Sequence, residues 1–302
     1  MKKDACILIT GANGFTGRHA YRYFSKLGLN VIPMFQTHTS AIHATNGVVC
    51  NLTNKTEVRN LIKRTRPEYV LHLAGHNSVL ESWKNPLDSI EINIIGTSYL
   101  LEALRQIVPS CKTLILGSAL QHDLTKKTIP PNPYSLSKTM QALIADAWGE
   151  LMDLNIIIAK PSNLIGPGNS TGICSLIGKK LIDIEKQQCE PIIEINNLQD
   201  TRDFLDVRDA VAAYHILLRD GETGKHYNIG SGIKRSLLEV LKVYKEITRI
   251  DFQIQETKKI KSNDQSILEL HDMRKHGWDP KIPFTDSLKD ILDYMRMSAY
   301  IQ

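Results

Sequence analysis

The feature that most constrains this chain is a regular alternation of short apolar runs and amphipathic segments through its first half. The apolar runs fall at residues 5–9, 30–35, 69–73, 113–116 and 156–159. Segments with helical periodicity lie between them, for example residues 94–108 and 137–152. Buried strands that alternate with helices form βαβ units, with parallel strands and helices on both faces of the sheet. Because such crossovers are right-handed, the pattern predicts an α/β fold with a doubly wound parallel sheet of the Rossmann type.

The pattern changes after about Pro161. Turn-forming residues then cluster at 166–168, 196–197, 221–224 and 230–232, and a last helix is expected near residues 286–297. We therefore predict a first domain over residues 1–160. Residues 161–302 are expected to form mainly a smaller C-terminal lobe that is interwoven with the end of the sheet.

Composition and charge exclude several classes of protein. No stretch approaches the ~20 apolar residues that span a bilayer, and the first apolar run is too short for a signal peptide, so a cytoplasmic protein without membrane contact is expected. The formal net charge is +5, and the basic residues form no concentrated stripe, so no nucleic-acid partner is predicted. The five cysteines lack metal-ligand or redox spacing, so we expect reduced thiols and no metal site.

A glycine-rich segment, residues 10–17 (Thr-Gly-Ala-Asn-Gly-Phe-Thr-Gly), follows the first expected strand and opens the first expected helix. Gly11 permits a tight turn, Gly14 lets backbone N–H groups approach a pyrophosphate, and Gly17 lets the helix pack closely on the strand. The helix N-terminus then faces the negative charge. The alternative is a structural turn that binds nothing, but the strand and helix on either side favour a dinucleotide site.

The end of the second expected strand bears on which dinucleotide is bound. The chain reads Phe35-Gln36-Thr37-His38-Thr39 there, without a carboxylate to bind the adenosine ribose of NAD. Small polar side chains leave room for a 2′-phosphate, so NADP(H) is favoured over NAD(H). No arginine is present to bind that phosphate, which makes the preference a small one.

Tyr134 and Lys138 are four residues apart and therefore share one face of an expected helix. A neighbouring ammonium and a cationic nicotinamide are expected to lower the tyrosine pKa from ~10 toward working pH. Ser118 stands at the carboxyl end of the preceding strand, where open α/β sheets bind ligands. Any one of these residues alone would be an ordinary surface or turn residue. Together with the glycine loop, they predict a proton-transferring triad.

These features resemble the extended short-chain dehydrogenase/reductase superfamily, the NAD-dependent epimerase/dehydratase family, whose members mostly act on nucleotide sugars. Besides the glycine loop and the triad, the resemblance is carried by residues 72–75, 93–97, 161–168, 202–209 and 227–232. It covers nearly the whole chain. Within the superfamily the chain is most similar to GDP-4-keto-6-deoxymannose reductases, which form GDP-D-rhamnose, over residues 78–83, 166–185, 190–193 and 202–209.

The resemblance implies roles for matching residues. The first domain would bind the cofactor through Gly11, Asn13, Gly14, Phe15, Gly17, Thr37, Asn51, Leu52, Leu73, Ala74, Gly75, Asn93, Tyr134, Lys138 and Pro161. The second lobe would supply most of the substrate site, whose expected residues are Ser78, Ser118, Asn163, Lys179, Arg202, Lys261 and Asp264. A homodimer is also implied, formed through the helix with Tyr134 and the helix after Asn93.

Four of these positions bear on nucleotide binding and leave the base of the substrate undecided. Arg202 could pair bidentately with a diphosphate, although without the resemblance an ion pair with Asp200 or Asp203 would be the preferred explanation. Asn51 replaces the aspartate that usually contacts adenine in the family, and its amide can still hydrogen-bond. Lys261 and Asp264 stand where the reductases have an arginine and a glutamate near the nucleotide. The base of the substrate, whether GDP, UDP, dTDP or CDP, therefore stays open.

Three reactions share this scaffold: 4,6-dehydration, epimerisation and reduction of a 4-keto sugar. Dehydration needs a carboxylate pair just after the serine, and Ala119, Leu120 and Gln121 cannot serve. Reduction by NAD(P)H of the C4 ketone of a nucleotide-linked 4-keto-6-deoxyhexose is favoured, in the synthesis of deoxysugars for surface polysaccharides. A 4-epimerase with tightly bound NAD is the alternative. A non-catalytic dinucleotide sensor is more remote, because such chains typically lose the tyrosine or the lysine.

Overall fold

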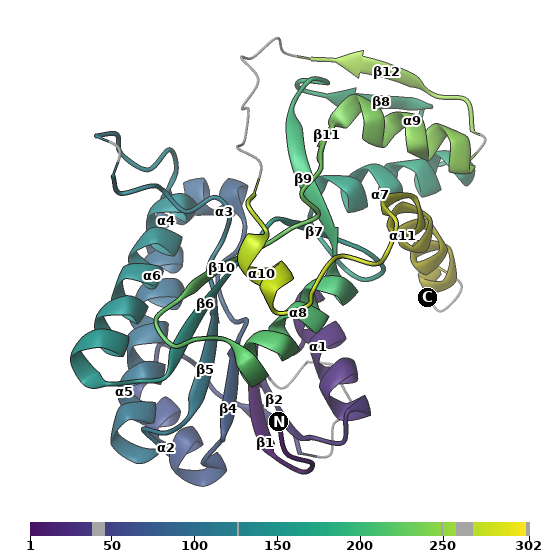
Figure 1. The fold of residues 1–302 in the computed structure, drawn as a ribbon. Helices are drawn as coiled ribbons and strands as arrows, with labels where there is room; N and C mark the ends of the chain where they lie inside the picture. The colour runs from purple at the N-terminus through teal and green to yellow at the C-terminus, as the bar shows by residue number, and fades with distance from the viewer. Residues whose placement is uncertain (38–45, 126, 249, 258–267, 300–302) are drawn as a thin grey trace. The chain divides into compact units, whose positions relative to one another are not determined.

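The computed structural model describes residues 1–37, 46–125, 127–248, 250–257 and 268–299 (Figure 1). It divides into two compact units. Residues 1–161 and 211–228 form the first unit, and residues 162–210 and 229–302 form the second. The chain thus returns to the first unit after Ala210, which a single boundary in the sequence does not express.

The first unit is built on a seven-stranded sheet in the order β3–β2–β1–β4–β5–β6–β10. Its strands are β1 (Cys6–Thr10), β2 (Asn30–Phe35), β3 (Val48–Val49), β4 (Tyr69–His72), β5 (Lys112–Leu116), β6 (Ile156–Pro161) and β10 (His226–Ile229). The registers of β1 with β2 and β4, and of β5 with β4 and β6, are parallel. The order reverses at β1, so the predicted doubly wound α/β fold is confirmed. Such a reversal opens a ligand crevice at the carboxyl ends of the strands.

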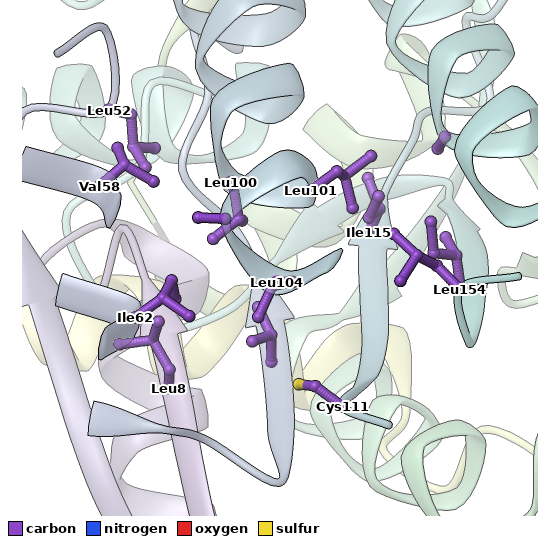
Figure 2. Close-up of a cluster of buried hydrophobic side chains, with 14 of the residues drawn as sticks. Leu8, Leu52, Val58, Ile62, Leu100, Leu101, Leu104, Cys111, Ile115 and Leu154 are labelled. Atoms are coloured by element: carbon purple, nitrogen blue, oxygen red, sulfur yellow. The ribbon is translucent and has the colours of Figure 1, made fainter. Parts of the chain in front are cut away.

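Apolar side chains attach one layer of helices to this sheet. The helices are α2 (Lys55–Thr65), α5 (Thr97–Ile107) and α6 (Pro133–Met152). Figure 2 shows Leu100 and Leu104 of α5 among strand residues such as Leu8 and Ile115, all fully buried. The first-unit part of α8 (Val207–Asp220) contacts α1 (Phe15–Lys26) instead, through the rings of Phe24 and His215.

Two helical segments differ from their expected bounds, for local reasons. The helix expected over 137–152 starts at Pro133, because Asn132 accepts a hydrogen bond from the Ser135 N–H at 2.8 Å and proline suits the first helical position. The helix expected over 94–108 follows two short helices, α3 (Val79–Lys84) and α4 (Pro86–Ile90), and a π-helical turn, η1 (Glu91–Gly96). Such π turns are rare and often occur at functional sites.

The second unit contains two small sheets and its own core. In one sheet, β9 (Thr201–Asp206) pairs parallel with β7 (Asn163–Ile165) and antiparallel with β11 (Lys234–Ser236). In the other, β8 (Ile192–Ile195) pairs parallel with β12 (Gln253–Glu256). The core gathers apolar side chains from these strands and from α7 (Ile173–Glu185), α9 (Leu237–Thr248) and α11 (Phe284–Ala299). A short helix, α10 (His271–Lys275), precedes α11. Across the described ranges, no helix is long and apolar enough to cross a membrane.

Candidate active site

The glycine loop between β1 and α1 is shaped by close backbone contacts. Gly11 has a φ of +67°, and a Cβ there would lie 2.8 Å from the Ala74 nitrogen. At Gly17 a Cβ would overlap the Gly11 carbonyl oxygen. Within the described chain, no side chain caps the first turn of α1. The N–H groups of this turn therefore suit an anionic ligand such as a pyrophosphate.

A cavity of about 220 Å³ lies against this loop. Eight predicted cofactor residues line it, namely Gly11, Asn13, Gly14, Asn51, Leu52, Leu73, Ala74 and Gly75. The sequence did not assign its other lining residues to the cofactor, and these are Met34, Gln36, Cys50, Thr53, Asn77 and Ile92. Most of these stand beside predicted residues at the carboxyl ends of strands, so the strand ends were the available signal. The glycine cradle, the open helix terminus and this cavity fit a dinucleotide.

The remaining predicted cofactor residues lie outside this lining. Phe15 and Gly17 are in the first turn of α1, and Pro161 ends β6. Thr37 is exposed just beyond β2, and Gln36 lines the cavity in its place. Asn93 is fully buried in η1, where its Oδ1 accepts the His76 N–H at 2.8 Å.

Ser118 and Tyr134 are brought together in a buried position. Ser118 follows β5 and is 7% exposed, and Tyr134, in the first turn of α6, is likewise 7% exposed. Their hydroxyl groups are hydrogen-bonded. Burial raises the pKa of Tyr134, and the Ser118 hydrogen bond opposes that rise. The expected lowering by Lys138 is therefore not found in the protein alone, where desolvation dominates.

Lys138 is almost completely buried, with 2% of its surface exposed. Its Nζ donates hydrogen bonds to the Leu116 carbonyl and to Gln141 Oε1, each at 3.0 Å. Burial lowers the pKa of Lys138 to about 7. The side chain also passes close to Gly75, because a Cβ at Gly75 would lie 3.3 Å from Nζ. Lys138 thus reaches the wall of the dinucleotide cavity.

The first turns of α6 are held by side chains from neighbouring helices. Ser82 of α3 accepts a hydrogen bond from the Tyr134 N–H at 3.2 Å and donates one to the Val79 carbonyl at 2.7 Å. Asn93 donates to Ser137 Oγ at 2.9 Å. Neither Ser82 nor Ser137 was predicted as a site residue, because a buried serine in a helix carries no signal of its own.

The predicted substrate residues are divided between the two units. Ser118 and Ser78 belong to the first, where Ser78 Oγ caps α3 by accepting the Glu81 N–H at 3.2 Å. The second contains Asn163, Lys179 and Arg202. Lys261 and Asp264 lie outside the described residues.

In the second unit, Asn163 and Arg202 are neighbours in one sheet. Asn163 of β7 pairs with Phe204 of β9 and donates to the Asp203 carbonyl at 3.0 Å. Arg202, two residues before Phe204, lies 3.9 Å from an oxygen of Asp200, so the simpler ion-pair partner is present. Lys179 is exposed on α7.

Comparison with known proteins decides the family. The NAD dependent epimerase/dehydratase family matches residues 7–230, which include the glycine loop, the triad and the cavity. The chain belongs to this family. It is an NAD(P)-dependent, nucleotide-sugar-modifying enzyme of the epimerase/dehydratase type, and the predicted resemblance is confirmed.

Relatives of the epimerase/dehydratase family match nearly the whole length of the chain. GDP-6-deoxy-D-mannose reductase of Pseudomonas aeruginosa is 28% identical and covers 95% of both chains. A solved structure of RMD from Pseudomonas aeruginosa complexed with NADPH has a TM-score of 0.82 at 26% identity, over 98% of this chain and 100% of that one. UDP-glucose 4-epimerase of Thermus thermophilus, complexed with NAD, has a TM-score of 0.84 at 23% identity, over 96% and 99% of the two chains. This last likeness is one of fold.

The packing at Gly17 leads to a first prediction. Gly17→Ala forces a Cβ against the Gly11 carbonyl, so the loop must move and NAD(P)H affinity should fall by about 100-fold or more, which corresponds to about 2.7 kcal/mol. Fluorescence titration with NADPH and NADH measures it. Gly149→Ala is the matched control, because its Cβ meets nothing nearer than 3.7 Å. Equal affinity of Gly17→Ala and the control would contradict the contact.

The buried Lys138 leads to a second prediction, on stability. The pKa of Lys138 is about 7 in the folded protein and 10.5 for an ordinary, exposed lysine, so folding releases a proton at pH values between these two. Stability should therefore rise with pH through this window, by about 1 kcal/mol per pH unit from this group. Urea unfolding of wild type and Lys138→Met at pH 7.5 and 9.5 checks it. The wild type should gain stability over the variant at the higher pH, and parallel curves would contradict a depressed pKa.

Proposed function

We propose that this enzyme reduces the C4 ketone of a nucleotide-linked 4-keto-6-deoxyhexose with NAD(P)H. The observation that carries the proposal is the buried Ser118–Tyr134 hydroxyl pair, together with the lack of a carboxylate among the three residues directly after Ser118. The similarity to GDP-6-deoxy-D-mannose reductase over 95% of the chain supports it, and a GDP-linked substrate is the first to test. A UDP-linked analogue is the second.

The proposed chemistry divides the work among three side chains. When bound, the dinucleotide supplies the hydride to the ketone carbon. Tyr134 donates its proton to the oxygen of that ketone as it becomes an alkoxide, and Ser118 hydrogen-bonds the same oxygen. The raised pKa of Tyr134 suits this direction, because it keeps the phenol protonated before transfer. Lys138 supports the tyrosine electrostatically and holds the cofactor ribose.

The residues after Ser118 favour reduction over dehydration. Dehydration needs an acid and a base there, and the chain has Ala119, Leu120 and Gln121. Gln121 is already engaged, because its Nε2 donates to the Lys138 carbonyl at 2.9 Å. The Gln121 amide therefore stabilises α6, the helix that carries Tyr134 and Lys138, and does not act as an acid or a base.

For the cofactor, we favour NADP(H). The side chains that line the described cavity include no carboxylate, and Gln36 stands where a ribose-binding acid would be expected. The similar RMD structure was solved with NADPH. For the substrate, we assign the second unit, with Asn163, Lys179 and Arg202 as contacts for the diphosphate and sugar. The ion pair between Arg202 and Asp200 is long, so little free energy is lost when Arg202 leaves Asp200 to bind the substrate.

The test is a coupled assay, and it gives the third prediction. Loss of NADPH or NADH absorbance is followed with GDP- and UDP-linked 4-keto-6-deoxy sugars that are made in situ by dehydratases. Tyr134→Phe should lower the rate by about 10²–10⁴-fold, because it removes the proton donor and leaves the packing.

The other outcomes of this assay are equally informative. If neither sugar consumes reduced cofactor, the reductase proposal fails for these substrates. Interconversion of UDP-hexoses without added cofactor would then establish the epimerase alternative. A Tyr134→Phe variant that keeps full turnover would remove this tyrosine from the mechanism.

We also propose that the enzyme is a homodimer that pairs through α6. Apolar side chains at helical spacing follow its outer face, and Leu136, Met140 and Leu143 are 40%, 37% and 46% exposed. Leu151 continues the stripe at 74% exposed, and Ile95 of η1 is exposed as well. A stripe of this kind is typical of a protein–protein contact.

The stripe leads to a fourth prediction. Leu143→Lys places a charge in the middle of the proposed interface and should convert the dimer to a monomer. Light scattering after size-exclusion chromatography measures the mass. Leu27→Lys, at a 43% exposed position where α1 ends, is the matched control. A wild type that runs as a monomer would contradict the proposal.

A further inference from the structure

A chain of buried polar side chains runs from the glycine loop to the catalytic lysine. Thr10 Oγ1 lies 2.8 Å from His72 Nδ1, and His72 Nε2 lies 2.9 Å from Thr97 Oγ1. Gln141 then donates from Nε2 to Thr97 Oγ1 at 2.8 Å and accepts from Lys138 Nζ at 3.0 Å. Each of these five side chains is at most 2% exposed. Water therefore does not compete for these bonds, and each is stronger than it would be at the surface.

This series of hydrogen-bonded side chains connects four separate elements of the fold. Thr10 ends β1, His72 ends β4, Thr97 begins α5, and Gln141 is on α6 one turn after Lys138. At the near end, the Ala74 N–H donates to Thr10 Oγ1 at 3.0 Å, and Ala74 lines the dinucleotide cavity. The wall of the cavity and the lysine ammonium are thus joined through one backbone N–H group, that of Ala74, and four side chains.

The bonds also fix which way the Gln141 amide points. Its oxygen faces a group that can only donate, the Lys138 ammonium, and its nitrogen faces Thr97. Reversal would place an NH₂ group against the ammonium. Burial and the Lys138 charge lower the pKa of His72 to about 3, so the imidazole stays neutral. With the His72 proton on Nδ1, the hydrogen bonds run in one direction. Gln141 donates to Thr97, the Thr97 hydroxyl donates to His72 Nε2, and His72 Nδ1 donates to Thr10.

We propose that Gln141 is the positioning residue for the Lys138 ammonium, oriented by the Thr97–His72–Thr10 relay that begins beneath the glycine loop. The inference deepens the proposed function, since it rests on Lys138 as the group that supports Tyr134 and the cofactor. Gln141 hydrogen-bonds to Lys138 and Thr97 and is not among the residues that line the cavity. It acts by stabilising the charged form of Lys138 and by aiming Nζ toward the wall of the cavity at Gly75.

Among the described groups around Lys138, Gln141 is the one suited to position its ammonium. The titratable groups that face it are His72 from β4, which is neutral, and Tyr134, which shares its helix face. The Leu116 carbonyl of β5 is its second acceptor, and a backbone group cannot be tuned. Among the described residues, no carboxylate hydrogen-bonds to Lys138, and Gln141 is the side chain that does.

The experiment measures the ionisation of Lys138 without substrate or cofactor. Urea unfolding of the full chain is followed from pH 6 to 10 for wild type, Gln141→Glu and Gln141→Met, each also in a Lys138→Met background. The difference within each pair isolates the lysine. Gln141→Glu should raise its apparent pKa by about one unit or more, because a carboxylate favours the ammonium. Gln141→Met removes the acceptor and should lower it.

Opposite shifts from two substitutions at one position are a result that loss of packing cannot produce. Thr97→Val should shift the pKa in the same direction as Gln141→Met, and it serves if either Gln141 variant fails to fold. Thr139→Val is the control, because the Thr139 hydroxyl donates to the Ser135 carbonyl at 2.7 Å on the same helix and is not hydrogen-bonded to the Lys138 ammonium. Thr139→Val should lower the free energy of unfolding and leave the pKa of Lys138 unchanged. Shifts of one sign, or none, in the Gln141 variants would overturn the proposal.

Steady-state kinetics separate this proposal from the proposed function. In the reductase assay, Gln141→Met should lower kcat by about tenfold or more at pH 7 while KM for the sugar changes less than threefold, since a change in proton transfer acts on the chemical step. If the pKa shifts as expected and no 4-keto sugar is reduced, the substrate is wrong and the positioning role stands. If turnover is found and the pKa does not shift, the positioning role is wrong.

Discussion

The site depends on a positive charge held away from water. Lys138 is buried where β5 ends, and two neutral oxygens take the place of the counter-ion that a buried ammonium usually has. This arrangement is costly to fold, and its benefit is a cation whose pKa lies near 7 instead of 10.5. The surrounding elements serve this one charge: β5 supplies a carbonyl, α6 supplies Gln141, and β4 supplies an imidazole that stays neutral. A charged His72 would repel the lysine.

Much of this architecture could be predicted from the sequence, because it depends on local patterns. The alternation of apolar runs and helical segments predicts the sheet, and Gly11, Gly14 and Gly17 predict the loop whose backbone contacts are now visible. Tyr134 and Lys138 are recognisable because their spacing has a chemical meaning. The family assignment follows from the same segments.

What the sequence does not reveal depends on long-range contacts between ordinary residues. Gln141 and Thr97 are 44 positions apart and His72 and Thr10 are 62 apart, so no local pattern connects them. The pKa of Tyr134 was expected to fall, because a neighbouring cation can be read from spacing while the extent of burial cannot. The return of residues 211–228 to the first unit is equally a matter of packing.

The π-helical turn η1 has a consequence for how the chain between β4 and α5 can vary. A π turn closes its hydrogen bonds over one residue more than an α turn does. Asn93 lies within that turn and faces His76 and Ser137, while Leu100 and Leu104 of α5 face the core. The turn therefore lets one continuous helical segment serve two partners whose directions an unbroken α-helix would not match. Deleting a single residue from it would move either the amide or the leucines out of phase, so the length of this segment is fixed even where its side chains are free to change.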